Sequence, residues 1–156
     1  MDFNDAISIV TAELTPQPWD YTTPDGTTLR VIPAGLREDA GYAEVLIRIT
    51  RADATGLGEF GITGPDGRGV AEVGVTTTGL PALIDALTER IAWEDTALVL
   101  GALTVVPDVD GVMVVVAEIH GRDQEVTVST VLPEAQRLPL ASALRRALDV
   151  ARGWES

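Results

Sequence analysis

The chain lacks cysteine and lysine entirely, and it has one histidine, His120. The absence of cysteine excludes disulfides, thiolate metal ligands and cysteine nucleophiles. The absence of lysine excludes Schiff-base chemistry and the lysine of a phosphate-binding loop. A metal site would depend on carboxylates, and a histidine-based mechanism would depend on His120. We therefore predict no metal site and no cofactor.

Positive charge is also scarce. The 11 cationic side chains, all of them arginine, stand against 24 acids, which leaves a formal net charge of −13. Phosphate binding needs a cationic face, so this balance argues against nucleic acid as a partner. It argues equally against adhesion to an anionic membrane, whereas it permits a basic protein partner.

Long apolar runs are missing too. The longest candidate, Val112–Ala117, is far shorter than the roughly 20 residues of a membrane span. The N-terminal stretch Met1–Asp5 is acidic where a secretory signal is basic, so we expect a cytoplasmic protein. With 156 residues, 46% of them hydrophobic, the chain can bury one core, and we predict a single domain spanning residues 1–156.

Hydrophobic periodicity and turn signals predict an α+β fold, in which an antiparallel sheet carries two or three helices. Apolar stripes at helical spacing predict helices at Leu80–Ile91 and Pro139–Arg152, the second capped by Gly153. Residues 2–14 fit a third helix by spacing and a strand by their β-branched content. The stretch Pro33–Gly41 is predicted to be a loop. Strands are predicted at Trp19–Thr23, Thr27–Ile32, Tyr42–Arg51, Leu57–Thr63, Val70–Thr77, Thr96–Val106, Val112–His120 and Glu125–Leu132.

The order of these elements suggests an internal repeat. Three strands and a helix occur in residues 42–92 and again in residues 96–152, at offsets near 55 residues. This order fits a βββα duplication, but it also fits an ordinary alternation of hairpins and helices. Within the second half, Val112–Ala117 is apolar at every position, which predicts a central strand covered on both faces.

Only weak catalytic candidates are present. His120 follows Glu118 by two residues on a predicted strand, so both side chains should share one face, and Asp123 follows in the next turn. A carboxylate beside histidine could make a general base, but no nucleophile motif accompanies it. The segment Asp108–Gly111 begins like a calcium loop, yet its twelfth position is Ile119 instead of glutamate, so it predicts a hairpin turn.

A second group of candidates would serve binding. Trp93 and Trp154 follow the two predicted helices, where each either packs onto the core or offers a contact to a partner. Glu94 and Asp95 lie directly after Trp93 and could form part of an acidic contact.

We therefore expect a non-enzymatic binding or adaptor protein of the inhibitor, immunity or chaperone type, acting on a protein partner, and the acidic composition is compatible with a basic one. One alternative is an enzyme or small-ligand-binding domain with a site assembled from carboxylates, arginine and His120. Another is a nucleic-acid mimic with a row of acids along one face. A homodimer is also compatible with the sequence, because a second copy could cover an apolar sheet face.

Overall fold

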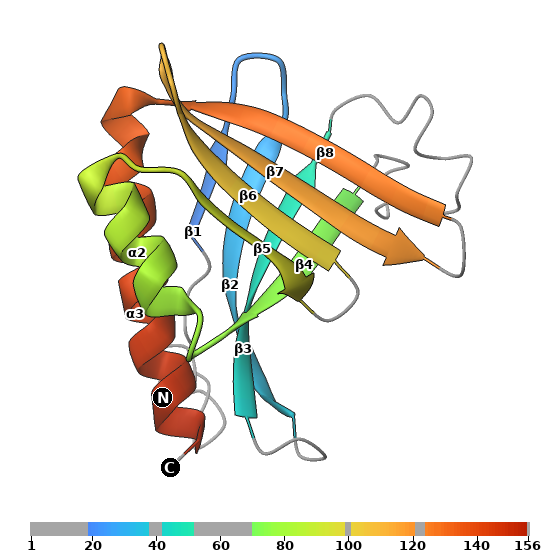
Figure 1. Ribbon diagram of the computed structural model, residues 1–156, viewed down its shortest axis with the longest axis vertical. Coiled ribbons are helices and arrows are strands. Elements are labelled where there is room, and N and C mark those ends of the chain that lie inside the picture. The colour runs from blue at the N-terminus through green and yellow to red at the C-terminus, as the bar shows by residue number, and fades with distance from the viewer. Residues whose placement is uncertain (1–18, 38–41, 52–69, 99–100, 121–123, 156) are drawn as a thin grey trace, which may run out of the picture.

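The computed structural model describes residues 19–37, 42–51, 70–98, 101–120 and 124–155. Within these ranges the chain forms two antiparallel four-stranded sheets and two α-helices, so the predicted α+β class is confirmed (Figure 1). A third helix at residues 2–14, the strand at Leu57–Thr63 and the turn residue Asp123 lie outside the described residues.

The first sheet contains β1 (Trp19–Thr22), β2 (Thr28–Arg37), β3 (Tyr42–Thr50) and β4 (Val70–Thr76), paired antiparallel in that order. The first two strands form the predicted hairpin, whose turn contains Gly26 at φ 88°, a conformation that favours glycine. Side chains alternate along the strands, so that one face is buried and the other is partly open to solvent. The inner face contributes Leu29, Val31, Val45, Ile47, Ile49, Val73 and Val75 to the core.

Strand β2 is longer than the sequence predicts. The prediction of a loop beginning at Pro33 is wrong as far as Arg37, because β2 continues to that residue. Its pairing with β3 shifts between Pro33 and Leu36. Such an irregularity allows a proline, which has no N–H to donate, inside a paired strand.

The second sheet contains β5 (Trp93–Leu98), β6 (Gly101–Asp108), β7 (Gly111–His120) and β8 (Gln124–Pro133), also antiparallel in that order. The single strand predicted at Thr96–Val106 is wrong. Two strands replace it, and they pair with each other so that Leu98 lies opposite Gly101. Gly101 permits this arrangement, because a Cβ at that position would lie 2.4 Å from the Ala117 carbonyl oxygen.

Strand β7 is central, as predicted, but its two faces differ. Val112, Val114 and Val116 are buried, whereas Met113 and Val115 on the opposite face are only half-buried. The expectation of cover on both faces therefore fails for the described part of the chain. The apolar residues of this outer face are available at the surface.

Helix α2 (Leu80–Glu89) begins with Pro81 in its first turn, where the missing N–H costs no helical hydrogen bond. Helix α3 (Arg137–Glu155) follows a 3-10 turn, η2 (Glu134–Gln136), and buries one stripe of leucine and alanine. It continues beyond the predicted end at Arg152, so Gly153 is a helical residue and not a C-terminal cap. Nothing lies within 4 Å of the position of a Gly153 Cβ.

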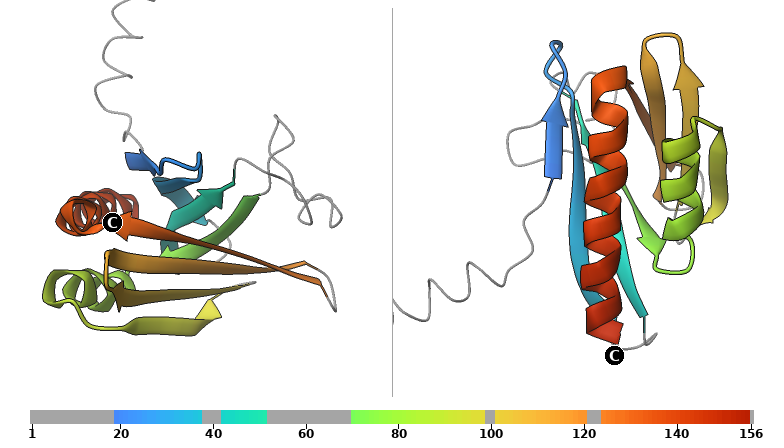
Figure 2. Two further views of the ribbon diagram at one scale, coloured as in Figure 1. Left: turned by 90° about the horizontal axis from the view of Figure 1, so that it is seen from above. Right: turned by 90° about the vertical axis from the view of Figure 1, so that its left-hand side faces the viewer.

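The two helices lie side by side along one side of both sheets (Figures 1 and 2). Helix α3, from the C-terminal half, packs against β2 and β3 of the first sheet. Helix α2, from the N-terminal half, sets Leu83 and Leu87 beside Leu103 and Val105 of the second sheet. Each half thus covers part of the other half, and one continuous hydrophobic core draws on both.

Among the described residues, four strands followed by a helix occur twice, in β1–α2 and in β5–α3. Each of these units has one strand more than the βββα order suggested by the sequence, and residues 52–69 of the first unit lie outside the described residues. The suggested halves, 42–92 and 96–152, begin inside these units. Strand β3 corresponds in order to β7, because each is the third strand of its sheet.

Within the described ranges, no helix is both long enough and apolar enough to cross a membrane. In the same part of the chain, no three histidine or acidic side chains gather as metal ligands would.

Candidate functional site

The weak catalytic candidates do not form a described constellation. Glu118 lies near the end of β7, where its Oε1 accepts a hydrogen bond of 2.6 Å from the backbone N–H of Glu72 on β4. This contact joins the two sheets. His120 is the last residue of β7 and pairs with Gln124, but its side chain, like all of Asp123, lies outside the described residues.

The binding candidates are spread over different surroundings. Trp93 begins β5 and Trp154 lies within α3, and both are half-buried against the hydrophobic core. Glu94 is exposed on the outer face of β5, whereas Asp95 is half-buried on the inner face and has an interaction partner. The structure therefore does not bring these four residues together into one contact surface.

The predicted hairpin turn between β6 and β7 is present. Asp108 Oδ2 accepts a hydrogen bond of 3.1 Å from the backbone N–H of Asp110, which closes the turn on itself. The residue between them, Val109, is 99% exposed. A single exposed valine in a surface turn is ordinary and does not by itself indicate a site.

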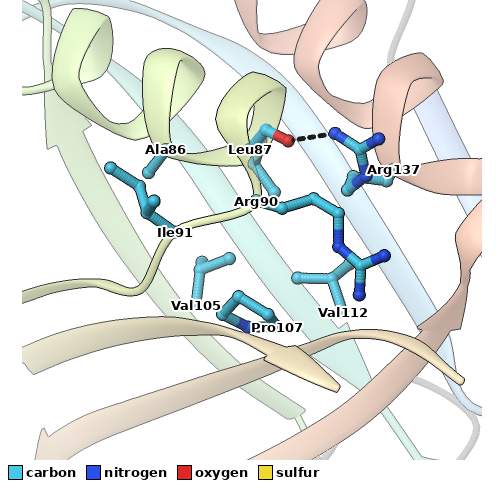
Figure 3. Close-up of a pocket in the computed structure, with 8 residues that line it drawn as sticks. All are labelled: Ala86, Leu87, Arg90, Ile91, Val105, Pro107, Val112 and Arg137. Atoms are coloured by element: carbon cyan, nitrogen blue, oxygen red, sulfur yellow. Dashed lines mark hydrogen bonds between the residues drawn. The ribbon is translucent and has the colours of Figure 1, made fainter. Parts of the chain in front are cut away.

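A small crevice lies where α2 ends above the second sheet (Figure 3). Its accessible volume is only about 10 Å³, which leaves room for about one water molecule. Arg137 Nη1 donates to the carbonyl oxygens of Leu87 at 2.6 Å and Thr88 at 3.0 Å. These are C-terminal carbonyls of α2, so the guanidinium caps this helix. The crevice is therefore part of the contact between α2 and α3.

The most extended candidate surface is the outer face of the second sheet, which we term the β5–β8 outer face. Its apolar members include Val106, Met113 and Val131, which lie side by side on β6, β7 and β8. Ile119 is 43% exposed and Val131 is 40% exposed. The described side chains of this face are those of Glu94, Ala102, Thr104, Val106, Met113, Val115, Ala117, Ile119, Thr127, Ser129 and Val131, and Glu125 takes the register position opposite Ile119 on β8.

Charge is absent from the middle of this face and present at its margins. The three cross-strand rows of β6, β7 and β8 that contain Ala117, Val115 and Met113 have no ionisable residue. The acids lie at the margins, with Glu94 on the edge strand β5, Glu125 opposite Ile119, and Asp108 and Asp110 at the β6–β7 turn. The result is an uncharged central area with acidic residues at its margins.

A second surface feature lies on the outer face of the first sheet. Arg30 and Arg48 are directly opposite each other on β2 and β3, and the neighbouring same-face pair is Thr28 and Thr50. These four residues line an open hollow of about 180 Å³, which we term the arginine hollow.

Sequence reasoning did not identify the arginine hollow. The sequence alone predicts that Arg48 and Thr50 share the outer face, because the strand Tyr42–Arg51 alternates. The sequence alone does not predict that Arg30 lies opposite Arg48, because this pairing depends on contacts between separate segments of the chain.

No protein-family model matches this sequence, and no curated protein matches it. A solved structure of MRP1/MRP2 from Trypanosoma brucei has a similar fold, with a TM-score of 0.64. The similarity covers 100% of this chain and 99% of that chain, at 16% sequence identity. At this identity the likeness shows the arrangement of strands and helices and nothing about activity.

Proposed function

We propose that this protein binds a polypeptide partner on the β5–β8 outer face. The observation that carries the proposal is the uncharged centre of this face, where Val106, Met113 and Val131 lie side by side, in a chain whose net charge is −13. A surface that had only to remain in solution would present charges at these outward positions. Apolar side chains of a partner would gain by covering Val106, Met113 and Val131.

The acidic residues at the margins of this face determine which kind of partner it favours. Glu94 lies at the margin of this face, and Asp108 and Asp110 lie at the β6–β7 turn at its end, so basic residues flanking an apolar segment would meet opposite charge. Such pairs contribute mainly to specificity and to the rate of association. The partner is therefore an apolar segment with basic flanks, and the role is that of a binding or adaptor protein.

The experiment compares partner capture from the native host by wild type and by three variants of the full chain. Val131→Glu and Ile119→Glu each place a charge on the β5–β8 outer face, and Leu138→Glu is the matched control. All three native side chains are comparably exposed, at 40%, 43% and 50%, so none of the changes should unfold the protein. We expect a protein retained by wild type and by the control to be lost with both sheet variants.

Salt provides the second arm of the test. Raising NaCl from about 0.1 M to about 1 M shortens the Debye length from about 10 Å to about 3 Å, so the captured complex should weaken. An affinity that does not change with salt would contradict the basic flanks. Equal capture by wild type and by all three variants would contradict binding at the β5–β8 outer face.

A homodimer would use the same face differently. Sedimentation equilibrium of wild type and Val131→Glu distinguishes the two cases. A monomeric wild type leaves the face free for another protein, as we propose. A wild-type dimer that becomes monomeric in Val131→Glu would assign the face to a second copy, and the proposed function would then be wrong.

A further inference from the structure

The arginine hollow contains an arrangement that the protein's own charges leave incomplete. Across β1, β2, β3 and β4 the outer-face row reads Asp20, Arg30, Arg48, Glu72. Arg30 pairs with Asp20 at 3.1 Å and Arg48 pairs with Glu72 at 2.6 Å. Both acids lie on the far sides of the arginines. The two guanidinium groups therefore face the hollow with no carboxylate of this row between them.

Like charges directly opposite each other on paired strands are unfavourable. An anion between Arg30 and Arg48 would turn the row into a strict alternation of negative and positive charge. The anion would reduce the repulsion between Arg30 and Arg48, because Asp20 and Glu72 contact these arginines only from the outer ends of the row. The position of the missing charge is thus defined by the four residues that are present.

Guanidinium N–H groups lie at this position. Among the described residues, Arg30 donates through Nη2 to Asp20 and Arg48 donates through Nε to Glu72, and an anion would meet the other Nη groups. Arg30 Nε has no hydrogen-bond partner within the described residues, but it is shielded from solvent and does not open onto the hollow. Thr28 and Thr50 add a hydroxyl each to the wall of the hollow.

The donor set fits a phosphoryl group. Guanidinium forks match the oxygens of phosphate, and a phosphoryl group in the hollow would share the two guanidinium groups with Asp20 and Glu72. The hollow of about 180 Å³ exceeds what a phosphate fills, so it accommodates a small organic group as well. The net charge of −13 opposes a long polyanion, which would extend beyond the hollow into acidic surroundings.

We propose that the arginine hollow binds the phosphoryl group of a small phosphomonoester. The site lies on the first sheet, whereas the proposed partner surface lies on the second. The inference is thus independent of the proposed function.

The test is a titration of the full chain, followed through the backbone amides of residues 28–30 and 48–50 by NMR. The probes are inorganic phosphate, glycerol phosphate and sodium acetate at matched ionic strength. We expect saturable shifts with both phosphate probes and at least tenfold weaker binding of acetate. No saturable shift with phosphate, or equal binding of acetate, would overturn the proposal.

Variants separate binding from a structural role. Arg30→Gln and Arg48→Gln should each weaken phosphate binding at least tenfold, whereas Arg145→Gln, an exposed arginine on α3, should leave it unchanged. Asp20→Asn keeps both guanidinium groups and removes a repelling carboxylate, so it should tighten binding about threefold. Weaker binding by Asp20→Asn, or wild-type binding by either hollow variant, would overturn the proposal.

Discussion

The carboxylate of Glu118 accepts a 2.6 Å hydrogen bond from the backbone N–H of Glu72 and thereby ties β7 to β4. The side chain of the same Glu72 pairs with Arg48 at 2.6 Å. The junction between the two sheets is therefore continuous with the wall of the arginine hollow. A residue that looks like half of a catalytic pair in the sequence has a structural bond in the fold.

Removal of this bond should destabilise the protein. Glu118→Ala leaves the Glu72 N–H without its acceptor, which costs about 1–3 kcal/mol for a donor shielded from water. Glu118→Gln keeps an acceptor oxygen and should lose less. Urea denaturation of the two variants measures the difference. Equal stability of Glu118→Ala and wild type would mean that the bond contributes nothing to the junction.

Gly101 should resist substitution because of its position at the start of β6. A Cβ there would lie 2.4 Å from the Ala117 carbonyl oxygen and 2.5 Å from Val73 Cγ1. The first of these atoms belongs to the backbone and cannot turn away. We expect Gly101→Ala to destabilise the fold by about 1–3 kcal/mol.

Gly153→Ala is the matched control for that change. Gly153 is exposed in α3 with no atom within 4 Å of a new Cβ. Alanine is the better helix former, so this variant should gain about 0.5–1 kcal/mol. Thermal unfolding of both variants would contradict the prediction if their melting temperatures moved in the same direction.

Gly101 and Gly153 also show how much of this fold the sequence alone predicts. Alternation and apolar stripes predicted most strands and both described helices, because local periodicity follows from burial. The β5–β6 hairpin was missed because no proline, asparagine or aspartate separates Leu98 from Gly101. This hairpin requires glycine at position 101 because a larger residue there would collide with Ala117 and Val73, which are distant in sequence.

The candidate sites were less predictable for the same reason. Val112–Ala117 was recognised as an apolar strand, but whether its second face is covered depends on the whole sheet. Likewise, the outward direction of Arg48 follows from alternation, whereas its position opposite Arg30 follows from the pairing of β2 with β3. The local sequence pattern predicts which face of a strand a side chain occupies. The pairing of distant strands decides which of these side chains come together in a site.

Arg137 should matter to the joint between α2 and α3. Its side chain is 14% exposed, and Nη1 donates to both Leu87 O and Thr88 O. Charge-assisted hydrogen bonds contribute about 1.5–3 kcal/mol each, so Arg137→Ala should lower the free energy of unfolding by a few kcal/mol. Arg145→Ala, on the exposed face of the same helix, should stay within about 0.5 kcal/mol of wild type.

Hydrogen exchange separates this cap from a general loss of stability. Amides in the last turn of α2 should lose protection in Arg137→Ala before those of the second sheet do. Uniform loss across the chain would contradict a local capping role.

The β1–β2 turn should respond to acid. Asp25 is exposed, and its pKa is lowered chiefly by the hydrogen bond that Thr23 Oγ1 donates to its carboxylate, and then by the backbone N–H of Thr27. The folded pKa therefore lies below the unfolded one. The carboxylate stabilises the turn above the unfolded value, near pH 4, and this contribution is lost as the pH falls through the folded pKa.

Carboxyl-carbon NMR of Asp25 measures the effect directly. The titration midpoint in the folded chain should lie below that of a peptide spanning residues 19–28. Thr23→Val removes the largest cause and should raise the midpoint toward the peptide value, while Thr22→Val, a neighbouring exposed change, should not. The same midpoint in Thr23→Val and wild type would show that the Thr23 hydroxyl does not stabilise the ionised carboxylate, and the lowered pKa would then depend on Thr27 and on the charge of Arg51.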